Sequence, residues 1–246
     1  MNILPNIEPQ PDTTTCGPTC LHALYRHFGD DFDLHEVIDT IHRLDHGGTL
    51  DVFLANHALA RGYSAEIYTY NLQVFDPSWF SGKDRLAEKL AAQMDAKPGD
   101  KQLGIATRGY LEYLDLGGQI RFTDLTRTLI RRLLRSGHPV LTGLSATYLY
   151  RSMREWGRDD QDDDIRGLPV GHFVLLTRYH AESREVEIAD PMQENPLGSQ
   201  VDNGADGYAD SQNYRVHIDR LIGAILLGAM TYDANLVVLH PPRPKD

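Results

Sequence analysis

Gln10-Pro-Asp-Thr-Thr-Thr-Cys16-Gly-Pro-Thr-Cys20-Leu21 is the stretch that decides the fold, because a polar turn passes directly into the start of a helix. Proline is favoured in the first turn of a helix, where its missing N–H would have no partner, and Pro18 fits that place. An apolar face then continues to Phe28, and Gly29 supplies a stop. The sequence therefore predicts a helix over 17–28, with Cys16 at its N-terminus.

The position of Cys16 predicts a reactive thiol. Unpaired backbone N–H groups and the helix dipole stabilise a thiolate, which is the nucleophilic form of cysteine. Cys20, one helical turn further on, is expected to pack in the core, and two cysteines in the whole chain make a disulfide framework implausible. The competing interpretation treats Cys16 as a small apolar residue at a helix start.

A nucleophilic thiol needs a base, and His172 has the most informative setting among the 11 histidines. It opens an apolar strand in Gly171-His172-Phe-Val-Leu-Leu, and the next strand ends at Asp190. A hairpin would bring this carboxylate back to the imidazole and fix its tautomer. The amide of Gln10 could join the Cys16 N–H in an oxyanion hole. His138 is the rival base, but the proline after it favours a structural role.

The order of the predicted elements indicates an α+β fold, because helices dominate the first half and short strands the second. We expect one domain over 1–246, built from two lobes. Helices are predicted over 17–28, 33–41, 50–61, 83–97, 124–135 and 220–227, and strands over 63–70, 139–144, 173–179, 185–188 and 235–239.

Two irregular insertions are expected, at about 147–168 and 191–212. Irregular stretches of this length in a compact domain are usually functional or disordered. The first insertion carries an acidic run, which we predict to bind a cationic part of the substrate or to act as a lid; the alternative is a solvated loop. The residues of this run are Asp159, Asp160, Asp162, Asp163 and Asp164.

Composition limits the classes of partner that the protein is expected to bind. The 24 basic against 35 acidic residues give a net charge of −11, which argues against a nucleic-acid partner because phosphates attract Lys and Arg. The first ten residues lack a signal-peptide pattern, and the most apolar stretch, 221–230, is about half the roughly 20 residues that cross a bilayer. We expect a cytoplasmic protein without membrane association. The sequence leaves the oligomeric state open.

Gln10, Cys16-Gly-Pro-Thr-Cys20, Gly171-His172-Phe-Val and Asp190-Pro191 together resemble the C39 and C39-like branch of the papain-like cysteine peptidases. The resemblance extends over most of the chain in order and spacing. It implies a papain-like fold, in which a helical lobe opens with the nucleophile and an antiparallel β lobe carries the base.

The resemblance also implies roles for individual residues. Cys16 would be the nucleophile, His172 the general base and acid, Asp190 the orienting group and Gln10 the oxyanion donor. The implied activity is that of a stand-alone cysteine peptidase or amidase, which hydrolyses a peptide or amide bond through an acyl-thioester on Cys16 and needs no metal or cofactor.

Other functions remain open. An acyltransferase or transamidase would use the same residues and pass the acyl group to an amine instead of water. A non-catalytic peptide-binding module on the same fold is a further alternative. A zinc site at Cys16, Cys20, His22 and His27 is disfavoured, because His22 would face away from both thiols on the helix. A thiol redox pair is disfavoured as well, since Cys-x-x-x-Cys within a helix is poor disulfide geometry.

Overall fold

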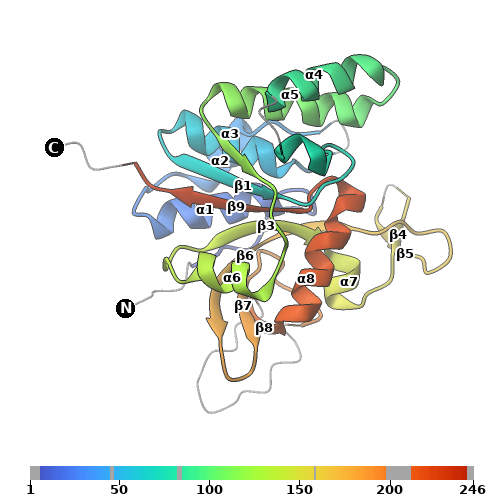
Figure 1. Cartoon of the computed structure of the whole chain (residues 1–246). Helices are drawn as coiled ribbons and strands as arrows, with labels where there is room; N and C mark the ends of the chain where they lie inside the picture. The colour runs from blue at the N-terminus through green and yellow to red at the C-terminus, as the bar shows by residue number, and fades with distance from the viewer. Residues whose placement is uncertain (1–5, 45–46, 82–84, 158, 198–211, 243–246) are drawn as a thin grey trace, which may run out of the picture.

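A seven-stranded sheet forms the centre of the computed structural model, which describes residues 6–44, 47–81, 85–157, 159–197 and 212–242. The strand order is β2-β1-β9-β3-β6-β7-β8, and helices cover both faces (Figure 1). Neighbouring strands are antiparallel except β1 and β2, which are parallel. The predicted α+β class is confirmed, with one parallel pair at the edge of the sheet.

The helices and strands have the following bounds. The α-helices are α1 (Cys16–His27), α2 (Leu34–Thr40), α3 (Asp51–Ala60), α4 (Leu86–Ala96), α5 (Lys101–Asp115), α6 (Arg127–Leu134), α7 (Ala146–Tyr150) and α8 (Ile218–Leu227), with short 3-10 turns η1 (Pro77–Phe80) and η3 (Gly228–Thr231). The strands are β1 (Ser64–Thr69), β2 (Gln119–Arg121), β3 (Val140–Ser145), β4 (Glu155–Trp156), β5 (Gln161–Asp162), β6 (Gly171–His180), β7 (Glu185–Ala189), β8 (Asn213–His217) and β9 (Asn235–His240). Within the described residues, no helix is long and apolar enough to cross a membrane.

Helix α5 has no counterpart among the predicted elements. Its buried side chains include Leu103, Tyr110 and Tyr113, but glycines interrupt the apolar pattern. Gly109 is required because a Cβ there would lie 2.6 Å from Cε1 of Phe53 on α3. The close packing of two helices therefore hides the helical signal in the sequence.

The insertion expected at 147–168 is not irregular throughout, and that part of the prediction is wrong. Helix α7 enters it, and the Ser145 hydroxyl accepts a hydrogen bond from the Tyr148 N–H at 3.3 Å. A small hairpin follows, in which β4 pairs with β5. Elements of two to five residues are too short to show periodicity. Most of the insertion expected at 191–212 lies outside the described residues, in 198–211.

The continuous apolar run of β6 is explained by burial on both faces of the sheet. Phe173 and Leu175 pack with α1 and α3 on one face, whereas Val174 and Leu176 pack with α6 and α8 on the other. Successive side chains of a strand point to opposite faces, so a strand between two helical layers needs apolar residues at every position.

Helix α1 approaches β6 closely because position 17 is glycine. A Cβ at Gly17 would lie 2.8 Å from Cγ2 of Thr49 and 3.2 Å from Cδ2 of Phe173. One turn later, the fully buried Cys20 donates its S–H to the Phe173 carbonyl at 3.4 Å. These contacts fix the N-terminus of α1 beside the beginning of β6.

Two buried carboxyl groups link α3 to the segment before β9. Asp51 accepts hydrogen bonds from the Asn235 amide and, at 3.3 Å, from the Tyr110 hydroxyl, and its own N–H donates to Asp233 at 3.4 Å. Burial raises the pKa of Asp51 to about 7, against the effect of these donors. Burial and the Asp51 charge raise the pKa of Asp233 well above its ordinary value. The folded protein therefore holds protons here that the unfolded chain releases.

This pair predicts a stability that falls as the pH rises. Its contribution is complete below the ordinary carboxyl pKa of 3.8 and is lost as the pH rises through about 7, by up to ~1.4 kcal/mol per pH unit for each extra proton held. Asp233→Asn removes one of the two carboxyls, so its free energy of unfolding should fall less steeply between about pH 4.5 and 6.5. Urea unfolding at several pH values measures the slope, with the exposed Asp95→Asn as control. Equal slopes in the wild type and Asp233→Asn would contradict the assignment.

Candidate active site

His172 and Asp190 form a buried pair at one end of the sheet. His172 is the second residue of β6, and Asp190 follows the last residue of β7. The two strands pair antiparallel, with Leu175 opposite Ala189, as the predicted hairpin requires. Nε2 of His172 lies 2.8 Å from Oδ1 of Asp190, and the two residues are 5% and 0% exposed. This geometry fixes the ring and leaves Nδ1 for another partner.

Cys16 lies at the first position of α1 and is 8% exposed. Its thiol is close enough to the His172 ring to help raise the pKa of the imidazole. The Thr15 side chain does not cap the N-terminus of α1, since its oxygen accepts a hydrogen bond from the Asp12 N–H at 3.2 Å and its hydroxyl donates to the Asp12 carbonyl at 3.1 Å. The first N–H groups of the helix are thus free of a side-chain cap beside the thiol.

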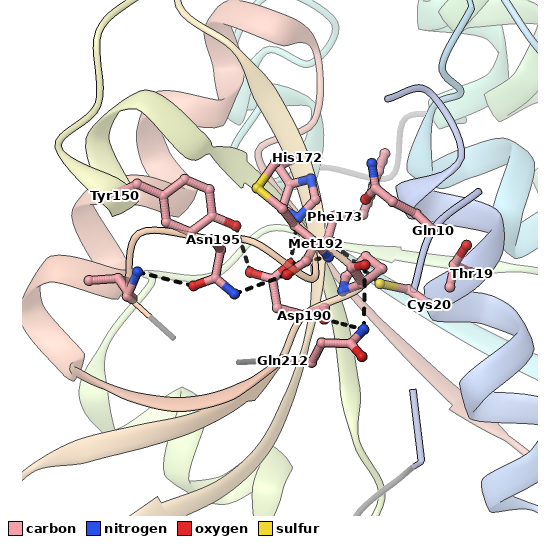
Figure 2. A network of polar contacts seen from close by, with 12 residues as sticks. Gln10, Thr19, Cys20, Tyr150, His172, Phe173, Asp190, Met192, Asn195 and Gln212 are labelled. Carbon is pink, nitrogen blue, oxygen red and sulfur yellow. Dashed lines mark hydrogen bonds and ion pairs between the residues drawn. The ribbon is translucent and has the colours of Figure 1, made fainter. Parts of the chain in front are cut away.

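Asp190 is surrounded by hydrogen-bond donors (Figure 2). The hydroxyls of Tyr150 and Tyr214 each donate to Oδ2 at 2.5 Å, and the Met192 N–H donates to Oδ1 at 2.9 Å. A buried carboxylate is tolerated only when both of its oxygens accept hydrogen bonds. Here Oδ1 contacts the imidazole and the Met192 N–H, and Oδ2 accepts from the two tyrosine hydroxyls. The site therefore holds a charged Asp190 in a water-excluded position.

The electrostatics of this group favour an ionised pair. Burial lowers the pKa of His172, but the Asp190 carboxylate and the neighbouring Cys16 outweigh it and raise the pKa to about 10. Burial raises the pKa of Asp190, yet the His172 charge and the donors around the carboxylate bring it below its ordinary value. Burial and the Asp190 charge raise the pKa of Tyr150 and Tyr214, so both remain phenols and can donate.

Gln10 is fastened to the segment that follows Asp190. Its backbone N–H donates to the Pro191 carbonyl at 2.9 Å, and Figure 2 shows its side chain beside the network. One N–H of the side-chain amide donates to the Asp12 carbonyl at 2.8 Å, which leaves the second N–H for another acceptor. Oε1 of Gln10 is buried without a hydrogen-bond partner. The role of Gln10 as an oxyanion donor stays a prediction.

The structure places the other candidate residues apart from this pair. His138 precedes β3, and its ring contacts His27 and His240, whereas β3 meets the His172 end of β6 at Ser145. Among the described residues, no group of three or more His, Cys, Asp or Glu side chains could hold a metal ion.

The five aspartates of the acidic run lie in and around the β4–β5 hairpin, which projects from the body of the domain beside α7 (Figure 1). Asp163 is engaged within this hairpin, since it accepts hydrogen bonds from the Arg166 side chain at 2.6 Å and from two backbone N–H groups. Substrate binding by Asp159, Asp160, Asp162, Asp163 and Asp164 stays a prediction.

Sequence reasoning did not identify Tyr150 and Tyr214. They come from the end of α7 and from β8, 40 and 24 residues away from Asp190 along the chain. No motif marks either tyrosine. The one signal is indirect: a buried carboxylate needs donors beyond one imidazole, and tyrosine hydroxyls can supply them.

Comparisons with known proteins agree with the motifs. The model of the Peptidase_C39 like family matches residues 5–216, and the chain belongs to this family, as the resemblance implied. None of the curated proteins matches the chain. Among solved structures, the chain is similar to a crystal structure of a Bacillus anthracis protein with a provisional assignment as a C39-like peptidase. The two share 12% identity with a TM-score of 0.49, and the match covers 100% of this chain and 98% of that chain.

The donors to Asp190 predict a stability effect that depends on pH. Tyr150→Phe or Tyr214→Phe should each lower the free energy of unfolding at neutral pH by about 1.5–3 kcal/mol, the range for hydrogen bonds to buried charges. The lowered pKa of Asp190 stabilises the fold above its ordinary carboxyl pKa, and this stabilisation is lost as the pH falls through the folded-state pKa. The difference in the free energy of unfolding between each variant and the wild type should therefore become smaller at acid pH.

Urea unfolding at neutral and acid pH measures this difference, with Tyr148→Phe as a matched control because Tyr148 lies on the same helix and is 45% exposed. Variants of Tyr150 and Tyr214 as stable as the control would show that these hydroxyls do not support Asp190.

Proposed function

We propose that the protein is a cysteine peptidase or amidase in which Cys16, His172 and Asp190 carry out the reaction. The observation that carries the proposal is the buried His172–Asp190 pair at 2.8 Å beside a cysteine at a helix N-terminus. A nucleophile, a base within reach and a third group that orients the base together form the arrangement for acyl transfer. Membership of the Peptidase_C39 like family supports the same chemistry.

In the proposed mechanism, the proton of the Cys16 thiol has already passed to Nδ1 of His172, since Nε2 is engaged with Asp190, so that the site rests as a thiolate beside an imidazolium. The sulfur attacks the substrate carbonyl, and the negative oxygen that forms accepts hydrogen bonds from the Cys16 N–H and the Gln10 amide. His172 then protonates the departing amine, which leaves an acyl-thioester on Cys16. Water, deprotonated by His172, attacks this thioester and releases the acid and the free thiol.

The substrate class follows from this chemistry and from the surface charge. A peptide or amide carbonyl fits the nucleophile, and the β4–β5 hairpin would favour a basic residue in the part of the substrate that reaches it. Replacing all five aspartates of the acidic run by Asn should then raise KM for a cationic peptide more than for a neutral one. Equal changes in KM would assign this run to a solvated surface.

Alkylation distinguishes the two cysteines. Iodoacetamide at near-neutral pH should label Cys16, which stands next to His172. Cys20 should not react, because it is fully buried, donates to the Phe173 carbonyl and has a pKa raised by burial. Peptide mass spectrometry locates the label. Equal labelling of the two, or a label on Cys20 alone, would contradict the proposed nucleophile.

Turnover tests the function itself. A peptide library read out by mass spectrometry should give hydrolysed products with the wild type and none with Cys16→Ala. Cys20→Ser keeps a donor of similar size for the Phe173 carbonyl and should retain activity. Products joined to an added amine would indicate acyl transfer. Cleavage that persists in Cys16→Ala would place the active site elsewhere.

A further inference from the structure

A cavity of about 640 Å³ lies between α7, α8 and the segment that enters β6. Its volume is typical of sites for small ligands or substrate side chains. The walls combine apolar side chains, hydroxyl groups and two guanidinium groups, and they include Thr147, Arg151, Pro169, Arg220, Leu227 and Met230. A ligand that fits would have an apolar part and a negatively charged group.

Arg220 gives the cavity its chemical character. It is the third residue of α8 and half-buried, and its Nε and Nη2 atoms are buried without any hydrogen-bond partner. Leaving buried donors of a charged group unpaired costs more free energy than almost any other polar arrangement. Unpaired donors on a guanidinium that lines the cavity favour an acceptor there, and a carboxylate matches the planar fork of a guanidinium.

A second cation stands next to it. Arg151 follows α7 in a left-handed backbone conformation, with φ of 57°, and is close enough for its charge to disfavour the charged form of Arg220. Burial and this repulsion lower the pKa of Arg220. An anion between the two side chains would offset burial and repulsion, because it favours the charged form of Arg220.

Asp219 is the one acidic side chain among the described residues that line the cavity, and it is already engaged. Its carboxylate accepts hydrogen bonds from Nε and Nη2 of Arg127, and Nε lies 2.7 Å from Oδ1. Arg127 lies on α6, outside the lining of the cavity. Asp219 therefore does not neutralise the positive charge of the cavity.

The cavity also adjoins the chain that leads to His172. The Thr147 hydroxyl accepts a hydrogen bond from the Val170 N–H at 3.0 Å, and Met230 precedes Thr231, whose side chain leaves no room for a Cβ at Gly171. Val170 and Gly171, the two residues directly before His172, therefore contact residues in or next to the wall of the cavity. Ser145, which also lines the cavity, pairs with Gly171, so the cavity lies beside the start of the strand that carries His172.

We propose that this cavity is a subsite for an anionic group, a carboxylate carried by a peptide substrate and held by Arg220 with support from Arg151. The proposal rests on the peptidase function proposed above and adds a substrate preference to it. The expected preference is opposite in charge to that of the β4–β5 hairpin, so the two surfaces would read different positions of a peptide.

The experiment compares peptides that differ in a single residue, with Glu, Gln or Lys at each position in turn, cleaved by the full-length protein. At one position the wild type should prefer Glu over Gln by roughly tenfold to a hundredfold in kcat/KM, as expected for hydrogen bonds to a charged group. Arg220→Gln should reduce this preference to about twofold or less while cleavage of the Gln peptide is retained. Arg215→Gln, at an exposed arginine of β8, is the matched control and should keep the preference.

A second arm identifies the source of the anion and separates this proposal from the proposed function. N-acetylglutamate, N-acetylglutamine and inorganic phosphate are titrated calorimetrically into the wild type, Arg220→Gln and Arg215→Gln. Binding of N-acetylglutamate or phosphate that is lost only in Arg220→Gln supports an anion site, even if no peptide is cleaved and the peptidase function fails. The proposal is overturned if neither anion binds and either no peptide is cleaved or cleavage shows no Glu preference at any position. It is equally overturned if Arg220→Gln leaves both readouts unchanged.

Discussion

The interaction between the buried imidazole of His172 and the carboxylate of Asp190 is the constraint on which the rest of the site depends. Removing both groups from water is costly, and the attraction between them compensates only if the remaining lone pairs are satisfied. Tyr150, Tyr214 and the Met192 N–H supply these donors from three separate segments. The ends of α7, β7 and β8 therefore converge on one carboxylate, and the reactive geometry is also a structural junction.

The second requirement is that a helix delivers Cys16 to this junction. Gly17 allows α1 to lie against Phe173, and the buried Cys20 contacts the carbonyl of the same residue. The nucleophile and the base are thus held near each other because residues next to them, on α1 and β6, pack directly together. Small errors in this packing would separate sulfur from imidazole, so the glycine and the second cysteine contribute to the site without taking part in the chemistry.

Much of this arrangement follows from local sequence. The polar turn before Cys16, the apolar strand after Gly171 and the hairpin that returns Asp190 each have a local signature, and the structure places His172 and Asp190 together accordingly. Contacts between distant segments have no local signature in the sequence. Tyr214 meets Asp190 because the sheet brings β7 and β8 side by side, and Tyr150 reaches it from the end of α7. The unpaired donors of Arg220 become visible only once α8 is placed beside α7.

The account is tested most directly by the protonation state of His172. We expect NMR titration of the ring nitrogens to show an imidazolium that persists well above neutral pH, in line with a pKa raised to about 10, and to show its loss at a much lower pH in Asp190→Asn. The site would then hold a charged imidazole against Cys16 because Asp190 is ionised. A His172 ring that titrates near 6.5, its ordinary value, and is unaffected by Asp190→Asn would contradict this account.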